Sequence, residues 1–78
     1  MPDILPHVTA RVHPVRHHLI ADDAALSDLG LHLVDLWGIA TDIEEALGIE
    51  IPGTTIERWE TVADVARDVG VLVGVEAV

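Results

Sequence analysis

The sequence contains no cysteine, and its only aromatic residues are Trp37 and Trp59. Without cysteine, the chain can form no disulfide, bind no metal through thiolates and supply no thiol nucleophile of its own. Because phenylalanine and tyrosine are also missing, the core has to be built from leucine, isoleucine, valine and alanine. This composition favours small interdigitated helices, and both tryptophans are expected to fill volume in their core.

Basic residues are scarce as well, since four of them stand against 14 acidic residues and leave a formal net charge of −10. A surface this acidic repels nucleic-acid phosphates and anionic lipid head groups, so neither is an expected partner. The natural complement is a basic surface on another protein. Charge of this size also opposes self-association at low salt, and we therefore expect a monomer.

The chain lacks a long apolar run. Its most apolar stretch, residues 69–75, contains two glycines and is far shorter than the roughly 20 residues that span a bilayer. The first residues lack the basic region and cleavage motif of a secretory signal, so we expect a cytoplasmic protein without membrane insertion. A chain of 78 residues buries only about 60% of its unfolded surface, which predicts a single domain over residues 1–78.

Helical spacing of apolar residues predicts a first helix over about residues 3–13. Pro14 is expected to stop this helix or to kink it onward to residue 20, because proline lacks the amide that a continuous helix needs. A loop follows as far as Gly30. The second helix is predicted over residues 33–47, with the following residues as its apolar stripe: Leu33, Leu36, Trp37, Ala40, Ile43 and Leu47.

Glycine and capping residues bound the remaining elements. Gly48 is typical of a helix C-terminus, and a turn at Pro52 leads into a short third helix over about 54–59. Thr61 with an aspartate three residues later predicts the cap of a fourth helix over 62–69, which the next glycine is expected to end. The predicted fold is all-α, a small four-helix bundle with one brief helix.

Four short segments, taken in their order and spacing, match those of a known family. They are Asp28-Leu29-Gly30, Ile43-Glu44-Glu45-Ala46-Leu47, Gly48-Ile49-Glu50-Ile51-Pro52 and Thr61-Val62-Ala63-Asp64. From about Ile20 to Val69 the chain resembles acyl carrier proteins. The resemblance implies a four-helix bundle that carries 4'-phosphopantetheine on the serine opening its second helix. It also implies recognition of that helix by basic patches on enzymes of fatty-acid, polyketide or related lipid assembly.

The same resemblance implies which residues would meet those enzymes. Four acids lie where the family's recognition surface would be: Asp35, Asp42, Glu44 and Glu45. Gly38 replaces an acidic residue often found there. The alternative is that these carboxylates only solvate the exposed face of the helix.

The chain departs from the family at the attachment site, where Leu33 stands in the place of the serine. A phosphodiester to phosphopantetheine requires a hydroxyl, which leucine lacks. His32 also replaces the aspartate that normally precedes the serine. Ser27 is the only serine and the remaining candidate for attachment, although its favoured role is that of a turn residue in the preceding loop. The residues therefore predict that this member carries no covalent cofactor.

No set of residues predicts catalysis, so we expect the chain not to be an enzyme. His13 and His17 have the i, i+4 spacing of two metal ligands, but Pro14 lies between them and no third ligand is evident, which favours surface histidines. We predict a carrier-like protein that docks on partner enzymes through its acidic second helix. The alternative is an interaction or regulatory module on the same fold that uses Leu33, Leu36 and their apolar neighbours.

Overall fold

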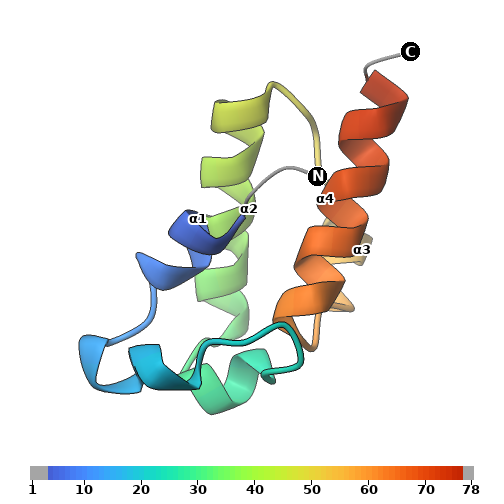
Figure 1. Ribbon diagram of the computed structural model, residues 1–78. Helices are drawn as coiled ribbons and strands as arrows, with labels where there is room; N and C mark the ends of the chain where they lie inside the picture. The colour runs from blue at the N-terminus through green and yellow to red at the C-terminus, as the bar shows by residue number, and fades with distance from the viewer. Residues whose placement is uncertain (1–3, 77–78) are drawn as a thin grey trace.

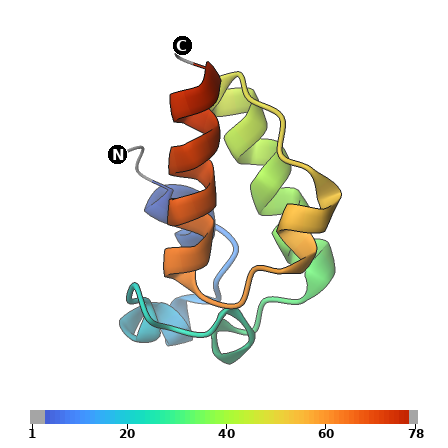
Figure 2. The same ribbon diagram turned by 90° about the vertical axis from the view of Figure 1, so that its right-hand side faces the viewer.

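The computed structural model describes residues 4–76, and regular structure in that range is helical apart from one isolated bridge between Ala25 and Thr61. The elements in chain order are α1 (Leu5–Thr9), η1 (Pro14–Leu19), η2 (Leu26–Leu29), α2 (Leu33–Leu47), α3 (Gly53–Glu57) and α4 (Val62–Glu76), where η marks a 3-10 helix. The two long helices, α2 and α4, run in the same direction from one end of the molecule, and α1 and α3 both pack against α2 (Figure 1 and Figure 2). The predicted all-α fold with four helices is confirmed.

A single aliphatic core joins these helices. Its buried members are Ile4, Val8, Val12, Leu26, Leu29, Leu31, Leu36, Ile39, Ala40, Ile43, Ile49, Ile51, Ile56, Trp59, Val62, Val65 and Val69. Every element except η1 contributes at least one buried side chain. Trp59 is the one aromatic residue among them, so the prediction of a core tryptophan is confirmed for Trp59. Its indole Nε1–H donates to Asp68 Oδ2 at 3.0 Å, which satisfies the polar end of a buried ring.

The N-terminal helix is shorter than the sequence predicted. α1 ends at Thr9, and Pro14 opens η1 instead of continuing or kinking a long helix. The predicted start at residue 3 lies outside the described residues. Proline pushes the residue before it out of the helical region, and His13 accordingly has an extended ψ of 136°. Two separate short helices are the result.

The last helix is longer than predicted, because α4 continues through Gly70 to Glu76. Glycine inside a helix costs about 1 kcal/mol relative to alanine, so it weakens a helix without ending it. Leu72 and Val73 pack against the core from the turns beyond Gly70. Their partial burial offsets that cost, and the predicted stop at Gly70 was wrong for this reason. The third helix also differs slightly from its predicted range, since α3 spans Gly53–Glu57.

Capping residues set the other boundaries. Gly48 follows α2 with a φ of 67°, a left-handed conformation that glycine adopts without strain. Before α4, the Thr61 hydroxyl accepts from the Asp64 N–H at 3.2 Å, while Asp64 Oδ2 accepts from the N–H groups of Glu60 and Thr61 at 3.0 Å each. These backbone donors, with the Arg67 guanidinium, hold the pKa of Asp64 below its usual value. The cap therefore persists to lower pH than an ordinary aspartate would allow.

The loop before α2 is tied to the linker before α4. Leu26 N–H donates to the Glu60 carbonyl at 2.8 Å, and Val62 N–H donates to the Ala24 carbonyl at 3.1 Å. These bonds fix η2 at the end of the molecule where α2 begins (Figure 1). Within residues 4–76, no helix combines the length and the apolar character needed to cross a membrane.

Candidate functional site

The start of α2 is the position to which the sequence assigned the missing attachment serine. His32 is the N-cap in an extended conformation, and its backbone N–H donates to Asp35 Oδ2 at 2.9 Å. Leu33 is the first helical residue and is 49% exposed, while Val34 beside it is 75% exposed. Residue 33 is thus accessible to a modifying enzyme, and its side chain offers only carbon and hydrogen.

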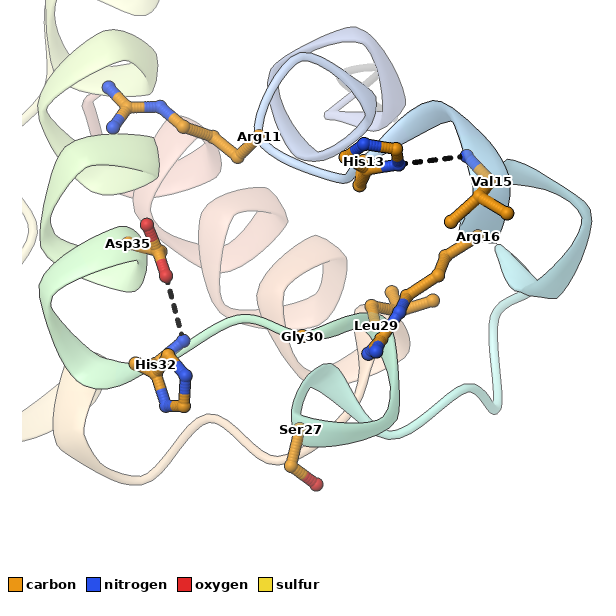
Figure 3. Close-up of a pocket in the computed structure, with 9 residues that line it drawn as sticks. All are labelled: Arg11, His13, Val15, Arg16, Ser27, Leu29, Gly30, His32 and Asp35. Atoms are coloured by element: carbon orange, nitrogen blue, oxygen red, sulfur yellow. Dashed lines mark hydrogen bonds between the residues drawn. The ribbon is translucent and has the colours of Figure 1, made fainter.

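Ser27 lies in a different element from the start of α2. It is exposed in η2, and its carbonyl accepts from the Gly30 N–H at 3.0 Å. Its hydroxyl points away from the pocket that Figure 3 shows beside the start of α2. Gly30 has a φ of 80° and separates η2 from the approach to α2. The hydroxyl of Ser27 is accessible, but Ser27 lies in η2 and not at the start of α2.

Three of the four acids predicted to dock partners make contacts within the chain. Asp35 accepts from the His32 N–H and so caps α2. Asp42 pairs with Arg11, with 3.1 Å between its Oδ2 and Nη2 of the arginine. Glu44 Oε2 accepts from the Ile51 N–H at 3.0 Å and holds the loop after α2. Glu45 is exposed and has no such contact.

Gly38 explains how Arg11 reaches Asp42. A β-carbon at residue 38 would overlap Nη1 of Arg11 and would lie 2.6 Å from Cζ. The guanidinium therefore rests on the bare backbone of α2 at residue 38. The absence of a side chain at Gly38 is thus what permits this close packing. A cation of the chain itself covers the middle of the acidic helix.

Replacing Gly38 with alanine is expected to change the free energy of unfolding by less than about 1 kcal/mol. Alanine gains about 1 kcal/mol of helix propensity, while expelling Arg11 removes an exposed ion pair with a typical contribution of about 0.2–1 kcal/mol. Urea denaturation measures the net change in the free energy of unfolding. Gly70→Ala in α4 is the matched control, because its added β-carbon would meet no atom within 4 Å. Gly70→Ala should therefore raise the free energy of unfolding by the full gain in helix propensity, about 1 kcal/mol. Equal stabilisation by the two changes would show that the Arg11 contact contributes nothing.

Exposed apolar side chains gather on the first turns of α2. We call Leu33, Val34 and Trp37 the α2 apolar patch. Trp37 is 43% exposed, and a β-carbon on Gly53 would approach its ring to 2.8 Å, so the indole lies over the start of α3. The prediction that Trp37 fills the core was wrong, because the buried face of α2 is rotated toward Ile39.

This rotation also changes the predicted apolar stripe. The buried residues of α2 are Leu36, Ile39, Ala40 and Ile43, whereas Leu33 and Leu47 are exposed. Leu36 belongs to the core, so it cannot take part in docking as the alternative hypothesis proposed. Val34, which was not singled out from the sequence, lies on the exposed face of α2 and replaces Leu36 as a candidate docking residue.

Two of the histidines near the N-terminus, His13 and His17, contact backbone groups. Nδ1 of His13 accepts from the Val15 N–H at 3.2 Å, and Nε2 of His17 lies 2.8 Å from the Val12 carbonyl. Because Pro14 starts a new 3-10 helix, the two rings do not share one face of a continuous α-helix. No group of three or more histidine or acidic residues within the described chain could hold a metal ion.

A surface pocket of about 710 Å³ opens beside the start of α2 and is lined by the segment that follows α1, by η1 and by η2 (Figure 3). Its lining residues are Arg11, His13, Val15, Arg16, Ser27, Leu29, Gly30, His32 and Asp35. The sequence analysis did not predict this pocket. One feature of the sequence could have drawn attention to this region. Residues 4–21 contain no aspartate or glutamate in a chain that is otherwise strongly acidic.

Comparison with known proteins identifies the class to which this scaffold belongs. The model of a family described as a phosphopantetheine attachment site matches residues 8–69, most of the chain. The chain therefore belongs to the phosphopantetheine-binding family of carrier proteins. Members of this family are non-catalytic, bind 4'-phosphopantetheine and interact with partner enzymes. No curated protein and no solved structure matches the chain significantly.

Proposed function

We propose that this protein is a carrier-family member that docks on enzymes of fatty-acid, polyketide or related lipid assembly without carrying covalent phosphopantetheine. The observation that carries the proposal is Leu33, an exposed aliphatic side chain at the first position of α2. A phosphoryl group needs an oxygen nucleophile, and residue 33 supplies none. The scaffold is otherwise retained, with the α2 and α4 caps and the loop contacts in place.

Docking through α2 is the second part of this proposal. The net charge of −10 favours approach of a basic surface. Among the four predicted docking acids, Glu45 is the one that makes no hydrogen bond or ion pair within residues 4–76. Asp42 remains partly exposed beside Arg11 and can exchange that partner for a basic residue of another protein. Asp35 and Glu44 chiefly stabilise the backbone at the start of α2 and in the loop after it.

Reversing the charge at residue 45 should weaken docking. The measurement is competition, in which the unmodified chain slows the loading of a serine-bearing carrier by a broad-specificity phosphopantetheinyl transferase. We expect Glu45→Lys to raise the inhibition constant about 3- to 10-fold, a loss of about 1 kcal/mol that shrinks at high salt. Glu50→Lys is the matched control, because Glu50 is exposed but lies outside α2. Equal losses in both variants would indicate attraction by net charge alone, and absence of any inhibition would contradict docking on this enzyme.

The α2 apolar patch supports a second candidate, an interaction module unrelated to acyl transfer. Leu33, Val34 and Trp37 are contiguous large apolar side chains exposed on one helix, and a tryptophan at such a site is a typical binding hot spot. The salt dependence of binding distinguishes the two candidate functions. Binding that depends on Trp37 and does not weaken between low and high salt would favour the apolar module, whereas salt-sensitive binding that depends on Glu45 favours carrier-type docking.

A further inference from the structure

Gly38 and Asp42 combine open backbone with a negative charge on one face of α2. They are four residues apart, so they are neighbours on the helix surface. Residue 38 has no side chain, and the backbone of α2 is therefore open to contact at this point. The carboxylate of Asp42 beside it is partly exposed. A flat cation can lie on this backbone and meet the carboxylate at the same time.

Arg11 is the cation that occupies this position in the structure. Its Nη2 lies 3.1 Å from Asp42 Oδ2. A β-carbon built on Gly38 would overlap Nη1 of Arg11, and it would lie 2.6 Å from Cζ and 2.7 Å from Nη2. All three guanidinium atoms thus lie in the space that a side chain at residue 38 would fill. Glycine and aspartate together hold a guanidinium by its shape as well as by its charge.

Arg11 reaches α2 from a distant segment of the chain. Its backbone N–H donates to the Val8 carbonyl at 3.0 Å just after α1, and the next residue, Val12, is buried in the core. Figure 3 shows the Arg11 side chain extending from there toward α2. Within residues 4–76 this is the one ion pair between distant segments, because Arg67 pairs with carboxylates of its own helix.

The backbone at Arg11 is fixed, but its guanidinium is replaceable. The Arg11 side chain is 37% exposed and that of Asp42 is 42% exposed. Exposed ion pairs contribute little to stability, because water and salt screen both charges. A second guanidinium can therefore displace the first at little cost. A lysine fits this position less well, since its compact and strongly hydrated ammonium does not match a flat surface.

We propose that Gly38 and Asp42 form a guanidinium-binding site, which Arg11 fills in the free chain and an arginine of the partner enzyme fills on docking. The partner arginine rests on the docking function proposed above, whereas the site itself does not. Arg11 acts as an internal competitor for Asp42. It favours partners that present an arginine at this point over partners that present a lysine.

Peptide binding to the full chain, followed by amide chemical shifts, tests the site itself. The probes are a short blocked arginine peptide and the same peptide with lysine in place of each arginine. The site is empty in Arg11→Ala. There the arginine peptide should bind at least about threefold more tightly than the lysine peptide and shift the amides of residues 38–42. Equal binding of the two peptides by this variant would overturn the site in favour of attraction by charge.

Two further substitutions, each combined with Arg11→Ala, test the contact with the backbone. Gly38→Ala fills the space above the helix with a methyl group and should abolish the preference for the arginine peptide. Gly70→Ala is the matched control, because its β-carbon would meet no atom within 4 Å, and it should leave the preference unchanged. A preference for arginine that survives Gly38→Ala would overturn the role of the bare backbone.

Competition by Arg11 is measured with the arginine peptide and with the phosphopantetheinyl transferase assay described above. Arg11→Ala should lower the dissociation constant of the peptide and the inhibition constant by about two- to fivefold each. Arg67→Ala is the matched control, because it also removes one exposed, ion-paired arginine and changes the net charge equally. Equal gains in both variants would overturn competition by Arg11.

The peptide and the enzyme separate this proposal from the docking function. If no variant inhibited the transferase while Arg11→Ala still preferred the arginine peptide, docking on that enzyme would be contradicted and the guanidinium site would be supported. If the chain inhibited the transferase but Arg11→Ala bound both peptides equally, docking would stand and the guanidinium site would be overturned.

Discussion

Trp59→Ala is expected to lower the free energy of unfolding by about 3–5 kcal/mol, the range measured when a large buried aromatic side chain is removed. Trp59 is 5% exposed, and its indole N–H donates to Asp68. Truncation leaves a cavity and removes the indole donor from Asp68 Oδ2, although the other carboxylate oxygen keeps its contact with Arg67. Because small domains are stable by only about 5–15 kcal/mol, a substantial fraction of the stability would be lost. Urea denaturation followed by circular dichroism measures the effect.

Trp37→Ala provides the control for this prediction. Trp37 is 43% exposed and lies over α3, so its removal should cost no more than about 1 kcal/mol. Trp59→Phe separates the lost hydrogen bond, worth about 0.5–1.5 kcal/mol, from the lost volume. If the two alanine variants were equally destabilised, the orientation of α2 described above would be wrong.

Leu33→Ser should accept a single phosphopantetheine, which we propose the native chain does not carry. The substitution places a hydroxyl on the exposed first residue of α2 and leaves the backbone contact between His32 and Asp35 intact. Intact mass after incubation with coenzyme A and a broad-specificity phosphopantetheinyl transferase reports the result. The expected change is from no detectable product to near-complete modification.

Val34→Ser is the matched control for this gain of function. Val34 is even more exposed than Leu33 but is one residue further along the helix, so its hydroxyl would point in another direction. We expect no loading. The double variant with His32→Asp and Leu33→Ser tests whether the preceding residue also matters, and it should load faster than Leu33→Ser alone. If neither Leu33→Ser nor the double variant were loaded, residue 33 would not be the family's attachment position.

The parts of the fold governed by local chemistry were predictable. Gly48 adopts the left-handed conformation that ends α2, and Thr61 and Asp64 form the reciprocal cap that begins α4. Pro14 interrupts the N-terminal helical pattern. Each of these features depends on a few neighbouring residues, so sequence spacing was sufficient to locate it.

The parts governed by packing were not predictable from one sequence. Gly70 resembles a helix stop, but side chains beyond it reach the core and extend α4. Trp37 and Ile39 both fit an apolar helical pattern, and only the positions of α1 and α3 decide which of them is buried. At the candidate site, Leu33 was identified from the family pattern. The contact of Arg11 with Gly38 joins distant segments and has no local signal.

The most direct test of the account is the intact mass of the unmodified chain after incubation with coenzyme A and the transferase, with Leu33→Ser treated in parallel as the positive control. We expect an unchanged mass for the native sequence and a gain of one phosphopantetheine for the variant. A gain of one phosphopantetheine by the native chain, with peptide mapping to Ser27, would contradict it. The protein would then be a loaded carrier whose attachment site lies in η2.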